Sequence, residues 1–435
     1  MTMLAVVLLA ACSRSDSDET SSSREGDCYI EFYVYQPDRP MVTRATDEAV
    51  IDPTDDDEST IHSLKIWAFR HSDASNHAPL GYLEVDETTD DNTTDDKKAG
   101  KNLLEIMNTN GQQMFKMKVP AEFADHPQNV DVYVVANEGG SGVSLGGNST
   151  REEIKAAKIT SFGVCSDYNA NNATAVKKVP DTGLPMSAML ENQPIYGSFP
   201  TLRIGDADGI ATLRLTRAVS KLRFVICRKK ETGNDKRILE SIKSIQLDER
   251  MIPTWSFLMP VAASSYNEAT YNATAMEYVQ EGAFERTTFE TNLTNSVSTI
   301  PQVSEDQEAP VGPVGPLKYA YTTQTPEDYE ALINEGVSKH DLKEFGITYL
   351  RESPKQLTGT IVYTIQERSS TATSWATKDE TAYFSMAAPG EFMRNHSWII
   401  YIFFMDEKLH TLTVTNLGMR DWSDGGSTDH SVYNW

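Results

Sequence analysis

The sequence is poor in basic residues and has no long apolar run. Its 435 residues include 39 Lys and Arg against 63 Asp and Glu, a formal net charge of −24 at pH 7. Such a charge repels phosphate backbones and anionic lipid head groups, so neither nucleic acid nor an anionic membrane surface is expected to bind the folded part. No apolar run reaches the roughly 18 residues of a membrane-spanning helix, so none is predicted.

Cysteine is also scarce, and no two cysteines have the spacing of metal ligands. The four are Cys12, Cys28, Cys165 and Cys227. If Cys12 is modified, as argued below, three remain, and an odd number cannot pair completely. Cys227 lies in an apolar run and is expected to be a buried thiol.

Sequence motifs for catalysis and for metal binding are missing as well. There is no zinc-protease His-Glu-x-x-His, no Gly-x-Ser-x-Gly elbow, no phosphate-binding loop and no dinucleotide fingerprint. The acidic stretches 52–58 and 86–96 and the segment 205–209 lack the full spacing of a calcium loop, so we expect loops and a turn there. The sequence therefore predicts no enzyme, no cofactor and no metal.

The N-terminus resembles a bacterial lipoprotein signal. The apolar stretch 4–11 is too short to span a membrane, and it ends in Leu9-Ala10-Ala11-Cys12, which is similar to the lipobox. This resemblance implies a signal peptide over residues 1–11 and lipidation of the Cys12 thiol. The polar segment 13–23 is expected to be a tether. Its acidic residues resemble the surface-export signal of Bacteroidia lipoproteins, although an ordinary linker is an alternative.

Alternation of apolar and polar residues dominates the rest of the chain, which is typical of half-buried strands. In residues 61–69, for example, Leu64, Ile66 and Ala68 share one face. Short helices are predicted at 151–158 and 326–335, and the proline-rich segment 310–316 is expected to be a loop. The predicted strands are 29–35, 61–69, 80–85, 114–119, 130–136, 211–215, 221–227, 241–247, 357–365, 381–386, 397–404 and 409–417.

Many short strands broken by polar turns predict an all-β chain built of β-sandwiches. Two similar sets of strands lie on either side of residues 215–219. We therefore expect an N-terminal sandwich over residues 45–216 and a C-terminal sandwich over residues 217–435, after a lipidated propeptide over residues 12–44.

Several segments, in their order along the chain, resemble the fimbrillin family, the subunits of type V pili in Bacteroidia. They are the lipobox at Cys12, the strand 29–35 with Val42-Thr43-Arg44-Ala45-Thr46 after it, the Val-Tyr-Val-Val-Ala-Asn run within 130–137, the segments 184–187 and 213–222, and the segments 394–398 and 421–426.

The resemblance implies two tandem transthyretin-like β-sandwich domains and a maturation pathway. The lipidated precursor would reach the outer membrane, and an extracellular Arg-specific protease would cut between Arg44 and Ala45. Arg39 is a weaker cleavage site because Pro40 follows it. Loss of the first strand would open a groove, which a strand of another pilus subunit would fill in the cell-surface fimbrium.

Two segments are candidates for this strand replacement. Ile30, Phe32 and Val34 alternate as side chains that plug a groove should. The C-terminal segment is the candidate donor strand, with Val432, Tyr433 and Trp435 as its apolar residues. Alternatively, this segment simply covers its own domain.

Three other functions stay open at this point. An anchor or tip subunit of the same pilus is one, and an anchor would keep its lipid and remain uncut at Arg44. A glycan-binding surface lipoprotein is another, and it would gather Trp and Tyr on one face. A glycosidase would need two carboxylates about 5 to 10 Å apart.

Overall fold

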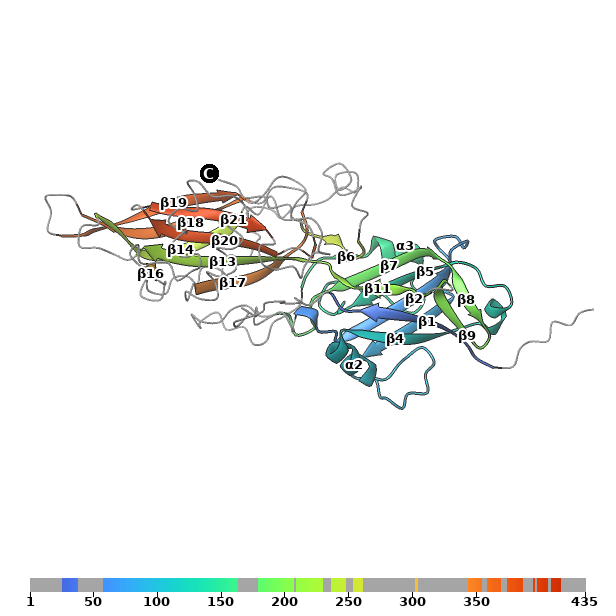
Figure 1. The fold of residues 1–435 in the computed structure, drawn as a ribbon. Helices are drawn as coiled ribbons and strands as arrows, with labels where there is room; N and C mark the ends of the chain where they lie inside the picture. Colours follow the sequence, from blue (N-terminus) through green and yellow to red (C-terminus); the bar gives the residue numbers. More distant parts are fainter. Residues whose placement is uncertain are drawn as a thin grey trace, which may run out of the picture.

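Strands dominate the regular structure of the described residues, as the computed structural model shows (Figure 1). The prediction of an all-β fold is therefore confirmed. The structure describes residues 26–37, 58–162, 179–206, 209–229, 236–247, 253–260, 302–303, 343–353, 358–368, 374–385, 394–395, 397–405 and 408–415.

Strands β1 to β5 and β7 to β12 form two sheets that face each other. In the six-stranded sheet the order is β10-β9-β1-β11, with β4 also paired to β1 and β8 paired to β9. Its strands are β1 (Cys28–Tyr35), β4 (Gln112–Val119), β8 (Ile195–Ser198), β9 (Thr201–Asp206), β10 (Gly209–Ile210) and β11 (Thr212–Arg214). The five-stranded sheet has the order β12-β7-β5-β2-β3. Its strands are β2 (Ser63–Arg70), β3 (Gly81–Asp86), β5 (Val130–Ala136), β7 (Met186–Gln193) and β12 (Thr216–Arg217).

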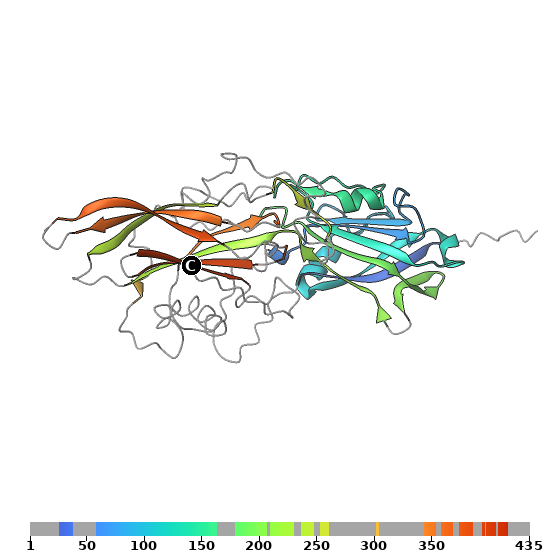
Figure 2. The ribbon, with the colours of Figure 1, turned by 90° about the horizontal axis from the view of Figure 1, so that it is seen from above.

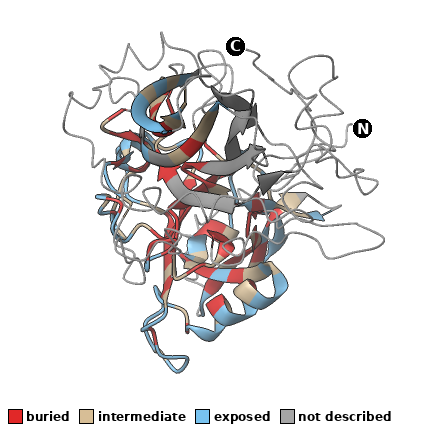
Figure 3. Cartoon of the chain, turned by 90° about the vertical axis from the view of Figure 1, so that its left-hand side faces the viewer, coloured by how far each residue is buried: buried red, intermediate tan, exposed pale blue. Residues whose placement is uncertain are grey.

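The five-stranded sheet has buried side chains on both faces. Leu64, Ile66 and Ala68 of β2 point into the main core, as the alternation predicts. Trp67 and Phe69 point the other way and are also buried, in a second cluster beneath α3 (Arg151–Ala156). Figure 3 shows the buried residues gathered in the strands at the centre, with exposed residues in the surrounding loops.

The remaining strands form two more sheets. One has the order β16-β13-β20-β21 with β17 paired to β13, and the other has the order β14-β18-β19. Figure 2 shows these two sheets lying one above the other. Their strands are β13 (Ser220–Lys229), β14 (Arg237–Leu247), β16 (Gln302–Val303), β17 (Lys343–Leu350), β18 (Thr358–Glu367), β19 (Ala376–Ser385), β20 (Ser397–Met405) and β21 (Lys408–Thr415). A short ladder of β6 (Lys158–Ile159) with β15 (Ser256–Phe257) joins the two parts of the chain.

The predicted strands are present, with ends that differ by up to five residues, but some elements escaped prediction. The predicted strand 211–215 is present only as β11 (Thr212–Arg214), because at Leu215 the chain passes from the six-stranded sheet to β12 of the five-stranded sheet. Strands β7, β8, β9 and β17 and the helices α2 (Asn102–Asn110) and η1 (Ala121–Ala124) were not predicted. The second half of β7 is exposed and polar, so it gives no apolar alternation.

Of the loops and helices predicted from the sequence, some lie in the described residues and others do not. Helix α3 is present, and Thr150 caps it in a capping box with Glu153. In segment 205–209, Gly205 and Asp206 belong to β9 and Gly209 to β10, which pair antiparallel, and residues 207–208 lie outside the described residues. Gly205 has φ 131°, and a Cβ there would lie 2.2 Å from the Gly209 carbonyl oxygen. The predicted helix 326–335 and loop 310–316 lie outside the described residues. None of the described helices has the length and apolar character needed to span a bilayer.

Candidate functional site

Strand β1, the predicted removable strand, lies in the middle of its sheet. It pairs with antiparallel β4 along its whole length, from Cys28 opposite Val119 to Tyr35 opposite Gln112. On its other edge it runs parallel to β9 over 29–31 and to β11 over 33–35. Both edges of β1 are therefore hydrogen-bonded, and its removal would leave unpaired backbone groups on both walls of the gap. We call this gap the β1 groove.

The inward face of β1 is completely buried. Cys28, Ile30, Phe32 and Val34 are each 0% exposed and belong to the main core. Phe32 stacks on Phe115 of β4, with ring centroids 6.5 Å apart. The alternation predicted for Ile30, Phe32 and Val34 is thus confirmed. Each such side chain contributes about 1.5 to 3 kcal/mol on burial, so an empty β1 groove would be strongly unfavourable in water.

The outward face of β1 has one nearly buried charge, Glu31. Its side chain is 6% exposed and lies between the two neighbouring strands. Glu31 Oε1 is 2.8 Å from Lys116 Nζ on β4, and Oε2 is 3.4 Å from Arg203 Nε on β9. The hydrogen bond from Lys116 comes first among the contacts that hold the pKa of Glu31 below its usual value. Glu31 therefore forms ion pairs with both β4 and β9, the strands on either side of the β1 groove.

A more exposed ion-pair chain lies at the start of β1. Lys118 Nζ is 2.7 Å from Asp27 Oδ1 and 2.9 Å from Asp96 Oδ2. The Tyr29 hydroxyl donates a hydrogen bond of 3.3 Å to Asp27. Asp27 and Asp96 are about half exposed, so these contacts contribute little to stability compared with the buried face.

A buried polar network holds the residues that follow the predicted cleavage site. Lys221 Nζ of β13 is 2.9 Å from Glu58 Oε1, and the Tyr349 hydroxyl of β17 also donates to that oxygen. Arg217 donates from Nε to the Glu58 carbonyl at 3.1 Å and from Nη2 to Ser59 Oγ at 2.7 Å. The acidic stretch 52–58 was expected to be a solvated loop, and for Glu58 this is wrong. Lys221, which is itself buried, supplies the positive charge beside its carboxylate, and Arg217 binds the backbone carbonyl of Glu58 and the hydroxyl of Ser59.

The structure brings two other carboxylates together, one on strand β3 and one just after strand β5. Glu84 and Glu138 both lie against Lys65, whose Nζ is 3.8 Å from Glu84 Oε1 and 2.7 Å from the Leu145 carbonyl oxygen. Burial raises the pKa of Glu138. The single Lys65 ammonium pairs with both carboxylates and offsets one of their two negative charges, so the cluster is an internal ion-pair group. Among the described residues no group of three or more His, Cys, Asp or Glu is placed to hold a metal ion.

Several residues singled out in the sequence lie outside the described residues. They are Cys12, Arg39, Arg44, Ala45, Cys165, Val432, Tyr433 and Trp435. Their roles in lipidation, cleavage and strand donation stay predictions. Cys28 is a buried thiol that forms no disulfide. The large apolar side chains exposed in the described residues include Tyr196 on β8 and Tyr383 on β19, which belong to different sheets.

Comparison with known proteins gives structural neighbours. No family profile and no curated protein matches the sequence. The chain is similar to the tip fimbrial protein Mfa3 of Porphyromonas gingivalis with a C-terminal truncation, with 12% identity, coverage of 90% of this chain and 99% of that chain, and a TM-score of 0.38. A fimbrial protein of Bacteroides vulgatus has 13% identity and a TM-score of 0.41, and the match covers 91% of this chain and 99% of that chain. A fimbrial assembly protein of Parabacteroides distasonis has 11% identity and a TM-score of 0.39, and the match covers 94% of this chain and 100% of that chain.

These neighbours are fimbrial proteins of the Bacteroidales. They are the kind of protein that the sequence motifs resemble. Identities of 11 to 13% and TM-scores of 0.38 to 0.41 describe a likeness in general outline, not in individual residues. The functional argument therefore depends on the β1 groove itself.

Proposed function

We propose that this chain is a structural subunit of a cell-surface pilus used in adhesion, and that β1 is a strand made to be replaced. Cleavage between Arg44 and Ala45 releases residues 12–44, and a strand of another subunit fills the β1 groove. The observation that carries the proposal is the position of β1. It is a central strand with a fully buried face, yet it precedes every other described element.

The covalent connection of β1 to the rest of the fold is simple. Residues 38–57, which include Arg44, join it to the next described residue, Glu58. Cys28 is the one cysteine of β1 and forms no disulfide. A cut at Arg44 therefore leaves β1 held by non-covalent contacts, which include hydrogen bonds, apolar packing and the Glu31 ion pairs. A strand with similar contacts can then exchange with it.

The two ends of the chain complete the proposal. Cys12 carries the lipid that holds the precursor in the outer membrane, before the subunit joins the fimbrium. The C-terminal residues Val432, Tyr433 and Trp435 form the donor strand. The partners are other pilus subunits and an extracellular Arg-specific protease, and the chain itself catalyses no reaction.

The test is to assemble the purified full-length chain in vitro. Wild-type chain and an Arg44→Ala variant are treated with an Arg-specific protease, and size-exclusion chromatography and electron microscopy follow their assembly. We expect oligomers or fibres from cleaved wild type, while Arg44→Ala remains monomeric. An Arg39→Ala variant is the control and should assemble like wild type. Wild type that is cut at Arg44 but stays monomeric, with partner subunits supplied, would favour an anchor or tip subunit instead.

A further inference from the structure

The β1 groove is lined by two cations on its outer side. Lys116 and Arg203 both lie in register with Glu31, one on each neighbouring strand. Their own side chains are 56% and 51% exposed, whereas Glu31 is 6% exposed. The position between them is therefore enclosed, while the two cations themselves reach water. When β1 leaves, Lys116 and Arg203 both lose this carboxylate.

The enclosed position discriminates between incoming strands by charge. A carboxylate there accepts from Lys116 and Arg203 together, and hydrogen bonds to charged groups are among the stronger ones. An ammonium group at the same position would face two like charges and would be repelled. An uncharged side chain would form no ion pair with Lys116 or Arg203. The inward positions on either side, those of Ile30 and Phe32, take apolar side chains.

We propose that the strand that replaces β1 has Asp or Glu at the position of Glu31, between two inward apolar positions. This inference rests on the proposed function and names the chemistry of the partner strand. It does not depend on the direction of the strand, because side chains alternate between the two faces in either direction.

Peptide exchange into the cleaved chain tests the proposal. A site for a sequence-specific protease replaces residues 41–46 of the full-length chain, and fluorescent peptides with the sequence of residues 28–35 are added after cleavage. Three peptides are compared, which carry Glu, Gln or Lys at the position of Glu31. Fluorescence anisotropy gives the apparent affinity of each. We expect the Glu peptide to bind about tenfold or more tightly than the Gln peptide, and the Lys peptide to bind most weakly.

Variants of the groove provide the matched controls. The double variant Lys116→Gln, Arg203→Gln should lose the preference for Glu, whereas Lys118→Gln should keep it, because Lys118 pairs with Asp27 and Asp96 instead. Binding of all three peptides within twofold of one another would overturn the proposed charge selection and leave the replacement of β1 intact. No uptake of any peptide would contradict the replacement of β1, and the charge selection with it.

Discussion

The ammonium group of Lys221 lies 2.9 Å from the carboxylate of Glu58, and both side chains are 0% exposed. Glu58 is the first described residue after the predicted cleavage site, whereas Lys221 is the second residue of the long strand β13. The pair therefore fixes the start of the first sandwich to the first strand of the following sheet. Removal of residues 12–44 would leave this contact in place.

Substitution of Lys221 by Met should destabilise the chain by about 3 to 5 kcal/mol, because Glu58 would then be a buried charge without its cation. Urea denaturation of the uncleaved chain measures the loss in free energy of unfolding. Lys243→Met is the control, since Lys243 pairs with Asp379 in an exposed contact of 2.5 Å, and it should cost less than about 1 kcal/mol. Equal losses of unfolding free energy in the two variants would show that the buried ion pair contributes no more to stability than the exposed one.

Phe32→Ala should reduce the free energy of unfolding of the uncleaved chain by about 3 to 5 kcal/mol. The ring is fully buried and stacks on Phe115, so its loss leaves a cavity in the main core. The neighbouring Tyr33 points to the other face and is partly exposed, so Tyr33→Ala should cost clearly less. Thermal denaturation monitored by circular dichroism compares the two. A larger loss for Tyr33→Ala would mean that the pleat of β1 is reversed.

The contribution of Glu31 to stability should depend on pH. Lys116, and then Arg203, hold the pKa of Glu31 below its value in the unfolded chain, which is about 4.3. A carboxylate with a lowered folded-state pKa stabilises the fold above the unfolded-state pKa, and this stabilisation is lost as the pH falls through the folded-state pKa.

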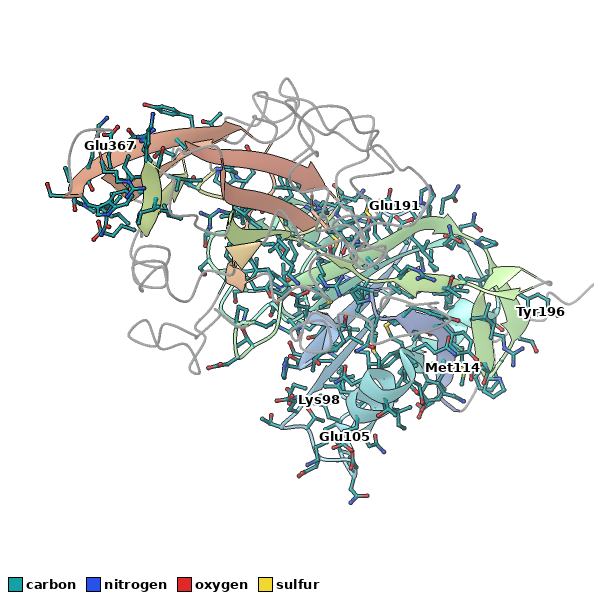
Figure 4. The ribbon with its side chains drawn as sticks, turned by 60° about the vertical axis from the view of Figure 1, so that its left-hand side comes forward. Lys98, Glu105, Met114, Glu191, Tyr196 and Glu367 are labelled. Atoms are coloured by element: carbon teal, nitrogen blue, oxygen red, sulfur yellow. The ribbon has the colours of Figure 1, made fainter. Side chains whose placement is uncertain are left out.

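Wild type should therefore exceed Glu31→Gln in free energy of unfolding at about pH 7, and the gap should close as the pH is lowered from about 5 toward 2. Urea denaturation at a series of pH values measures it. Glu105→Gln is the control, because Glu105 lies on the exposed face of α2, at the edge of the molecule in Figure 4. A gap that grows on acidification would contradict the assigned ion pairs.

Local patterns in the sequence predict the strands that matter most for the site. Alternation identified β1, β2 and β5, because each has apolar residues at every second position facing the main core. It also predicted that Ile30, Phe32 and Val34 would be buried together. Strand β7 was missed because its last residues are exposed and polar. Helix α2 was missed because its apolar residues are confined to 103–107, a run too short to establish the helical period.

The charged contacts of the site could not be predicted from local patterns. Glu31 is 172 residues away from Arg203, and Glu58 is 291 residues away from Tyr349. Such partners become neighbours only when the order of strands in the sheets is known. The acidic stretch that includes Glu58 was read as solvated because its buried cation, Lys221, comes from a distant strand.

The composition of the mature fibre tests the central claim most directly. Fibres sheared from the cell surface are digested, and mass spectrometry compares peptides that cover Cys28–Tyr35 with peptides from β2 and β5. If β1 is removed and replaced, the β1 peptides should be absent or strongly depleted, and the first residue of the subunit should be Ala45. Recovery of β1 peptides in equal amounts to those of β2 and β5 would contradict the account.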